Sequence, residues 1–195
     1  MGTPVLIVQG HPDCSRPHLC HALANAYADG AGAAGHLVER IEPARLRLPL
    51  LDDPDGWQHQ APPPEVVLAQ EAIRRAQHLV FIYPLWLGDM PAMLKGFLEQ
   101  VARPGFAIDP SGRNPLRAGL LRGRSARLVV SMGMPALVYR WFYGAHSVRL
   151  MRRSILGFAG IAPVRITLVG GAAVLKPEQV ERWCRQMHRL GVNAS

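Results

Sequence analysis

Three short segments place polar or aromatic side chains directly after an apolar run. These segments are Gly10–Leu19 (GHPDCSRPHL), Pro84–Pro91 (PLWLGDMP) and Gly133–Tyr139 (GMPALVY). In the first, His11 and Ser15 precede a predicted helix, whose free backbone N–H groups and dipole favour an anion such as a phosphate. An equally good alternative is that Asp13 or Ser15 only caps that helix. In the second, Trp86 offers a flat wall against which a planar ligand could lie, although it could also belong to the core.

Several kinds of unaided catalysis are disfavoured by what these segments lack. The first contains neither the G-x-G-x-x-G fingerprint of an ordinary dinucleotide-binding Rossmann domain nor the G-x-x-x-x-G-K-[ST] loop of a P-loop nucleotide hydrolase, so both classes are disfavoured. Ser131 is not in a G-x-S-x-G elbow, because Val129 occupies the place of the first glycine. No pair of carboxylates follows the strands with a spacing that suggests general acid and base work. We therefore expect a cofactor to supply the chemistry.

The first segment also gathers residue types that bind metals. They are His11, Cys14, His18, Cys20 and His21. His18 and His21 share one face of the predicted helix, but Cys20 points elsewhere, and no second cluster supplies matching ligands. We expect no metal site.

Apolar runs alternate with segments of helical spacing along the whole chain. Strands are predicted at Val5–Gln9, His36–Ile41, Leu79–Tyr83, Arg124–Met132 and Val164–Val169. Helices are predicted at Pro17–Ala33, Pro62–Gln77, Pro91–Ala102, Ala136–Phe158 and Pro177–Leu190. Between them, Glu42–Pro64 is predicted to be irregular. This alternation predicts a single domain over residues 1–195, a doubly wound α/β fold with a five-stranded parallel sheet and helices on both faces. Ligands of such sheets bind at the carboxyl ends of the strands, where the three segments would lie.

Positive charge is concentrated in the second half of the chain. The chain carries 22 Lys and Arg against 14 Asp and Glu, and only two of these cations are lysines. Residues 1–97 hold 7 basic and 10 acidic side chains, residues 98–195 hold 15 and 4, and no carboxylate side chain lies between Asp109 and Glu178. Codon bias would explain the choice of arginine but not the segregation, which suggests an anionic partner: nucleic acid, a membrane surface or a phosphate-bearing small molecule. Nucleic acid is disfavoured, because lysine-rich runs and aromatic residues interleaved with the arginines are missing.

The cysteines and the N-terminus bear on the compartment. Three cysteines are an odd number without framework spacing, which favours a reducing cytoplasm. The opening MGTPVLIVQG has no charged region before its apolar run and is predicted to be a strand rather than a signal peptide. No apolar stretch reaches the roughly 18 residues of a membrane span. We expect a soluble cytoplasmic protein.

A set of motifs in a fixed order resembles the NAD(P)H quinone oxidoreductase family. The set comprises His11-Pro12, the Pro-x-Trp-x-x-x-x-Pro-Ala-x-x-Lys-Gly run at Pro84–Gly96, Gly105-Phe106, and the series Gly133, Tyr139, Gly144 and His146. That family includes mammalian DT-diaphorase and bacterial flavoprotein subunits of potassium efflux systems. The resemblance implies a flavodoxin-like fold, non-covalent FAD or FMN, and a homodimer with active sites at the subunit interface. It also implies that hydride passes from NAD(P)H through the flavin to a quinone-type acceptor, or alternatively that the chain is a regulatory flavoprotein subunit of a membrane transporter.

The resemblance also implies roles for particular residues. His11 and Ser15 would approach the flavin phosphates. Pro84, Leu85, Trp86 and Leu87 would flank the isoalloxazine ring, and Ser131, Met132 and Gly133 would cross its other side. Tyr139 and His146 would stabilise charge on the reduced flavin. Judged without the resemblance, Tyr139 could equally pack within an aromatic cluster, and His146 could be a solvated histidine.

Overall fold

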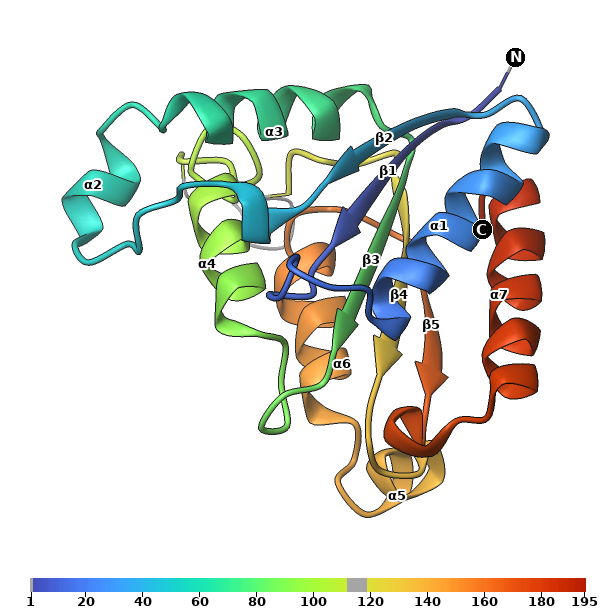
Figure 1. The fold of residues 1–195 in the computed structure, drawn as a ribbon. Helices are drawn as coiled ribbons and strands as arrows, with labels where there is room; N and C mark the ends of the chain where they lie inside the picture. The colour runs from blue at the N-terminus through green and yellow to red at the C-terminus, as the bar shows by residue number, and fades with distance from the viewer. Residues whose placement is uncertain (1, 112–118) are drawn as a thin grey trace.

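The computed structural model describes residues 2–111 and 119–195, and its centre is one parallel sheet (Figure 1). The strands are β1 (Pro4–Gln9), β2 (Leu37–Ile41), β3 (His78–Pro84), β4 (Ser125–Ser131) and β5 (Val164–Val169). Their order is β2-β1-β3-β4-β5, and all four pairings are parallel. The chain leaves β1 toward β2 on one side and later continues from β3 on the other. The carboxyl ends of β1 and β3 therefore flank the point where strand order reverses, which is the usual ligand crevice of such sheets.

The predicted five-stranded doubly wound sheet is confirmed. β1 and β3 are buried along nearly their whole length, because continuous apolar runs suit a strand covered on both faces. β2 is mostly exposed, as expected for an edge strand.

Helices cover both faces of the sheet (Figure 1). On one face lie α1 (Leu19–Ala33) and α7 (Pro177–Val192), and on the other lie α3 (Pro64–Arg75), α4 (Ala92–Val101), α6 (His146–Leu150) and the π-helical segment η3 (Met151–Gly157). Two apolar cores follow, one on each face. The backbones of α1 and α7 touch: a Cβ at Gly30 would lie 2.0 Å from the carbonyl oxygen of His188, and one at Gly191 would lie 2.1 Å from that of Tyr27. Glycine at both positions is what permits this approach.

The single long helix predicted over Ala136–Phe158 is wrong. The structure has α5 (Ala136–Trp141), a break, and then α6 running into η3. Gly144 and Ala145 at the break have φ values of 60° and 49°, a left-handed conformation that cannot continue a right-handed helix. The helical spacing of the apolar residues persists across the break, which is why the pattern concealed it.

The stretch predicted to be irregular contains two short helices. They are the 3-10 turn η1 (Pro43–Arg45) and α2 (Pro54–Gln58). Asp53 caps α2, with its carboxylate accepting from the N–H of Gly56 at 2.6 Å. A further 3-10 turn, η4 (Ala172–Val174), follows β5. Within the described ranges, no helix combines the length and apolar character that crossing a bilayer requires.

Candidate functional site

A cavity of about 400 Å³ opens at the carboxyl edge of the sheet, beside the ends of β1, β3 and β4. Its lining consists of His11, His18, Leu19, Cys20, Pro84, Leu85, Trp86, Ser131, Met132, Gly133, Ala172 and Ala173. The structure thus brings together seven residues that the sequence singled out: His11, Pro84, Leu85, Trp86, Ser131, Met132 and Gly133. Those it adds come from the start of α1 and from η4. The Gly170-Gly171 pair directly after β5 was a usable signal for η4, because that loop lies at the same sheet edge.

Asp13 organises the loop that follows β1. Its Oδ1 accepts from the N–H of Ser15 at 2.9 Å and from the Ser15 hydroxyl at 2.5 Å. Its Oδ2 lies 2.7 Å from His18 Nε2 and accepts from Arg16 Nε at 3.2 Å. Ser15, His18 and Arg16 together hold the pKa of Asp13 well below its usual range. Ser15 is therefore engaged within the loop and lies outside the cavity lining, and the N-cap of α1 is His18 rather than Asp13 or Ser15.

Three histidines stack beside the cavity. The rings of His11 and His18 are nearly parallel, with centroids 3.8 Å apart, and His21 accepts from the backbone N–H of His18 at 3.1 Å. Burial, followed by repulsion from His18, lowers the pKa of both His11 and His21. The lowered pKa keeps the His11 and His21 rings mostly uncharged at neutral pH, and Trp86 meets His11 edge-on at a centroid distance of 6.0 Å. In the described part of the chain, no three His, Cys, Asp or Glu side chains converge as metal ligands would.

The start of α1 provides donors at the cavity. The backbone N–H groups of Leu19 and Cys20 have no acceptor among the described residues, as is usual for the first turn of a helix. Both residues line the cavity. α1 is 15 residues long, so its dipole adds to these two donors and favours an anionic group at this end of the cavity.

The loop after β3 forms a tight turn. The backbones of Trp86 and Asp89 exchange two hydrogen bonds, of 2.8 and 3.0 Å, and Leu85 donates to the carbonyl of Ser131 at 2.7 Å. The N–H groups of Leu85 and Trp86 are thus used within the protein, and the loop offers the cavity its side chains. Leu87, with φ of 48°, is fully exposed and lies outside the lining. Such a left-handed conformation at a bulky residue is costly and recurs at functional sites.

The opposite wall comes from the end of β4. The N–H of Gly133 has no acceptor within the described residues, and a Cβ built there would meet no atom within 4 Å. Gly133 therefore leaves both space and a donor at the cavity. Next to it, the Ser131 hydroxyl contacts Cys20 Sγ at 3.2 Å. Burial raises the pKa of Cys20 to about 11, so this thiol is protonated at neutral pH and unreactive.

Tyr139 and His146 lie outside the cavity lining. The Tyr139 side chain is buried, and its hydroxyl contacts Ser147 Oγ at 2.6 Å and accepts from the N–H of Val148 at 3.4 Å. These bonds tie α5 to the start of α6. His146 opens α6 directly after the left-handed Ala145 and is exposed. Tyr139 thus acts on the turn that presents His146.

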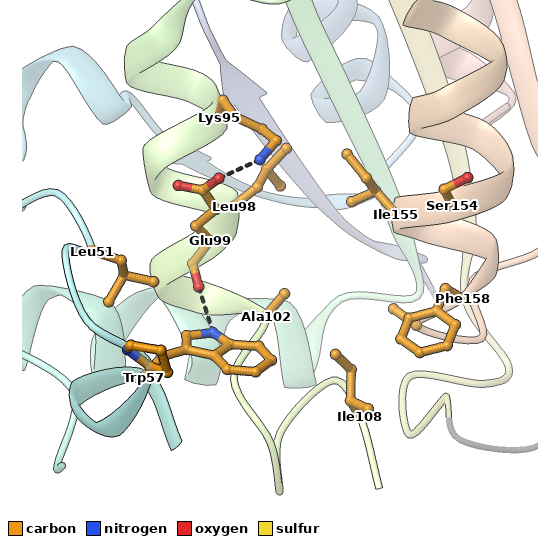
Figure 2. A pocket seen from close by; sticks show the side chains of 12 residues that line it. Leu51, Trp57, Lys95, Leu98, Glu99, Ala102, Ile108, Ser154, Ile155 and Phe158 are labelled. Carbon is orange, nitrogen blue, oxygen red and sulfur yellow. Dashed lines mark hydrogen bonds and ion pairs between the residues drawn. The ribbon is translucent and has the colours of Figure 1, made fainter. Parts of the chain in front are cut away.

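A second, larger hollow of about 510 Å³ lies between α4 and η3 (Figure 2). Leu51 and Trp57 face it from the side of α4, and Ile155 and Phe158 face it from the side of η3. The Trp57 indole N–H donates to the carbonyl of Glu99 at 3.1 Å, and Lys95 pairs with the Glu99 carboxylate. We call this hollow the α4–η3 groove. It is mainly apolar and its one lysine is paired, so it suits an apolar partner rather than a phosphate-bearing ligand.

The sheet order, the crevice at β1 and β3, and the donors at the start of α1 define the class of flavodoxin-like α/β proteins. The model of a family described by its flavodoxin-like fold matches residues 3–190, and the chain belongs to that family. This confirms the kinship that the motif order indicated.

Named relatives agree with this kinship. The human ribosyldihydronicotinamide dehydrogenase [quinone] is 39% identical over 70 residues, which cover 36% of this chain and 29% of that protein. The glutathione-regulated potassium-efflux system ancillary protein KefG of Erwinia tasmaniensis is 36% identical over 70 residues, which cover 36% of this chain and 35% of that protein. The similarity therefore spans well under two thirds of either relative.

Two solved structures share the fold along nearly the whole chain. The NAD(P)H:quinone oxidoreductase from Methanothermobacter marburgensis superimposes with a TM-score of 0.79 at 24% identity, covering 99% of this chain and 97% of that one. An FMN-dependent NADH-azoreductase from Bacillus anthracis, in complex with FMN, has a TM-score of 0.74 at 19% identity, covering 99% and 98%. At these identities the likeness establishes the fold.

Proposed function

We propose that this protein is a flavin-dependent NAD(P)H oxidoreductase that passes electrons to a quinone-type acceptor. The observation that carries the proposal is the cavity at the ends of β1, β3 and β4. It has two free backbone donors, those of Leu19 and Cys20, at the helix start, and a flat wall at Trp86. This combination fits a planar ring joined to a phosphate. The names of the human relative and of the Methanothermobacter structure support the acceptor class.

Each part of the cavity has a task in this proposal. A bound flavin supplies the redox chemistry by accepting hydride from NAD(P)H and delivering two electrons to the acceptor. The N–H groups of Leu19 and Cys20 hold its phosphate, and Gly133 donates to its ring edge. Trp86 excludes water from one side of the ring. His146, positioned through Tyr139, stabilises negative charge at the same sheet edge.

We further propose that the protein is a homodimer in which a second copy covers the α4–η3 groove. Trp57, Ile108 and Phe158 line this groove together, and an apolar surface of this kind is typical of the core of an oligomer interface. Light scattering of the flavin-loaded protein tests the mass. Replacing Phe158 with Asp is expected to shift it toward the monomer, whereas Leu37→Asp, at an exposed position on β2, leaves it unchanged.

Thermal shift with FMN and FAD, followed by turnover, tests the main proposal. A ligand that binds the native state raises the melting temperature with its concentration, and we expect the larger rise with FMN, whose single phosphate matches the one helix start. Without a quinone the loaded protein should oxidise only the one equivalent of NADH or NADPH that reduces its flavin, and continued turnover should require the quinone. Failure to bind either flavin, or binding without any turnover, contradicts the proposal.

A variant pair at Trp86 tests the geometry. Trp86→Ala is expected to weaken flavin binding at least about fivefold, because an aromatic contact contributes on the order of 1 kcal/mol beyond its buried area. Trp86→Phe keeps a ring and serves as the matched control. Equal flavin affinity in the two variants would show that the flavin does not contact the side chain of Trp86.

A second candidate function follows from the similarity to KefG. A chain that serves as an ancillary subunit of a potassium-efflux system would bind flavin but turn over negligibly, and it would co-purify with a membrane transporter. Turnover numbers with quinone, measured beside such a pull-down, separate the two functions.

A further inference from the structure

Exposed apolar side chains lie on the segments that follow β3, β4 and β5 at the carboxyl edge of the sheet. We call them the apolar rim: Leu87, Leu137, Trp141, Phe142 and Val174. Trp141 and Phe142 are 77% and 81% exposed, and Leu87 is completely so. The rim comes from three separate segments, namely the loop after β3, α5 and η4, and α5 and η4 form the lower tip of the molecule in Figure 1. Large aromatic side chains standing in water at a tip call for a partner.

A basic groove adjoins this rim on the β5 side. It is a hollow of about 540 Å³ between α5, the α6–η3 segment and β5. Its walls carry Arg140, Arg149, Arg152 and Arg153. None of these four arginines pairs with a carboxylate in the parts of the chain that the structure describes. We call this hollow the arginine groove. Arg140 joins it to the rim, because its guanidinium lies 5.8 Å from the centroid of the Trp141 ring.

We propose that this edge of the molecule binds the surface of an anionic lipid bilayer. The four arginines would bind lipid phosphates, and Trp141 and Phe142 would insert at the level of the headgroups. Apolar and aromatic side chains beside a basic face are the signature of proteins that lie on a membrane without crossing it. The proposal rests on this surface chemistry and does not depend on the redox activity.

The charges at the mouth agree with an anionic partner. Two carboxylates lie on the β1 and β3 side of the cavity, and both are engaged: Asp13 by Ser15, Arg16 and His18, and Asp89 by the N–H of Met90. Lys176, after η4, is exposed and adds a further positive charge near the rim. Glu178, in the first turn of α7, offsets Lys176, and Asp89 keeps its negative charge, so the excess positive charge of this edge comes from the four arginines of the arginine groove.

A second copy of the chain is a poorer occupant of this surface. The α6–η3 segment sends Ile155 and Phe158 to the α4–η3 groove and its arginines to a different hollow. In a two-fold symmetric contact through the arginine groove, the same arginines would face each other and repel. A bilayer of anionic lipid instead supplies counter-charges to all four.

Flotation of the flavin-loaded protein with protein-free vesicles tests the proposal. We expect at least about tenfold stronger binding to phosphatidylcholine vesicles that contain phosphatidylglycerol than to phosphatidylcholine alone, and weaker binding as salt rises. Because the vesicles contain no protein, a transporter cannot mediate the result. Failure to float, or equal binding to the two lipids, overturns the proposal, and so does light scattering that shows rim-dependent self-association in place of vesicle binding.

Two triple variants with the same net charge test whether the arginine groove is the surface that binds lipid. The test variant is Arg149→Gln, Arg152→Gln and Arg153→Gln, and the control is Arg182→Gln, Arg185→Gln and Arg189→Gln on α7. Only the test variant should lose binding tenfold or more, with circular dichroism checking that both are folded. Trp141→Ser, at an exposed position, gives an independent arm and should also reduce binding. Equal losses in the two triple variants would mean that net charge alone drives binding, which overturns the assignment.

Discussion

Cys20 and Ser131 meet at the cavity although 111 positions separate them in the chain: the Cys20 sulfur lies 3.2 Å from the Ser131 hydroxyl oxygen. Cys20 belongs to the first turn of α1 and Ser131 is the last residue of β4. The contact therefore ties the helix start that offers free N–H donors to the strand end that carries Gly133. Both walls of the proposed flavin site are held by this buried pair.

Burial should make the Cys20 thiol react far more slowly than the exposed thiol of Cys14. Its pKa is raised to about 11 by burial, whereas Cys14 is exposed on the loop after β1. Since the thiolate is the reacting species, iodoacetamide at pH 8 should modify Cys14 at least about a hundredfold faster than Cys20. Peptide mass spectrometry over time gives both rates. The urea-unfolded chain is the control, in which the two rates converge, and equal rates in the native protein would contradict the buried position.

Asp13 is expected to govern flavin affinity without contacting the flavin. Asp13→Asn weakens the contacts with Ser15, Arg16 and His18 that fix the loop before α1. We expect an approximately tenfold rise in the flavin dissociation constant, because charge-assisted hydrogen bonds are stronger than neutral ones. Asp55→Asn removes a comparable exposed pair, with His59, far along the chain and should leave the affinity unchanged. Titration by flavin fluorescence quenching checks both, and equal affinities in the two variants would contradict the role of Asp13.

The strands were predictable because burial on both faces leaves a plain record in the sequence. Val164–Val169 agrees with β5 to the residue, and β1, β3 and β4 differ from prediction by a single residue at one or both ends. The break before α6 was hidden because apolar spacing continues across it. Gly144 indicated a possible break, because glycine readily adopts a positive φ. Alanine rarely does so, and the left-handed conformation of Ala145 could not be predicted from its residue type.

The candidate site was predictable where it depends on strand ends and less so where it depends on side-chain direction. Trp86 and Gly133 line the cavity as expected, since topology alone places their loops together. The Ser15 side chain could have faced the cavity, but its hydroxyl donates to the Asp13 carboxylate instead. The spacing of residues in the sequence does not encode this hydrogen bond. Leu87 likewise turns outward through a left-handed backbone conformation.

His78 gives the fold a dependence on pH. Burial, with repulsion from Arg127 and Arg165, lowers its pKa to about 4 from an ordinary 6.5. The folded state thus binds this proton less tightly than the unfolded chain does. The contribution of neutral His78 to the free energy of unfolding is fully present above pH 6.5. It is lost as the pH falls from 6.5 toward 4, and the loss reaches about 2.5 kcal/mol at pH 4.5.

Urea unfolding of the wild type and of His78→Asn at pH 7 and pH 4.5 measures this loss. All other groups titrate alike in the two proteins, so the difference between them reports His78. The wild type should lose about 2.5 kcal/mol more than His78→Asn over this interval. His59→Gln, at an exposed histidine, is the control and should follow the wild type. Parallel losses in wild type and His78→Asn would show that another group sets the pH dependence.

The hydrogen bond between Tyr139 and Ser147 separates two roles for Tyr139. Its 2.6 Å length and full burial predict that Tyr139→Phe and Ser147→Ala each cost about 1–2 kcal/mol of unfolding free energy, and that the double variant costs less than their sum. If Tyr139 acts through the turn that presents His146, both single variants lower kcat to a similar degree, because both loosen that turn. A Tyr139 hydroxyl that itself met the reduced flavin would make Tyr139→Phe alone lower kcat. Urea unfolding of the four proteins, with steady-state kinetics of the two single variants, therefore distinguishes a positioning residue from a catalytic one.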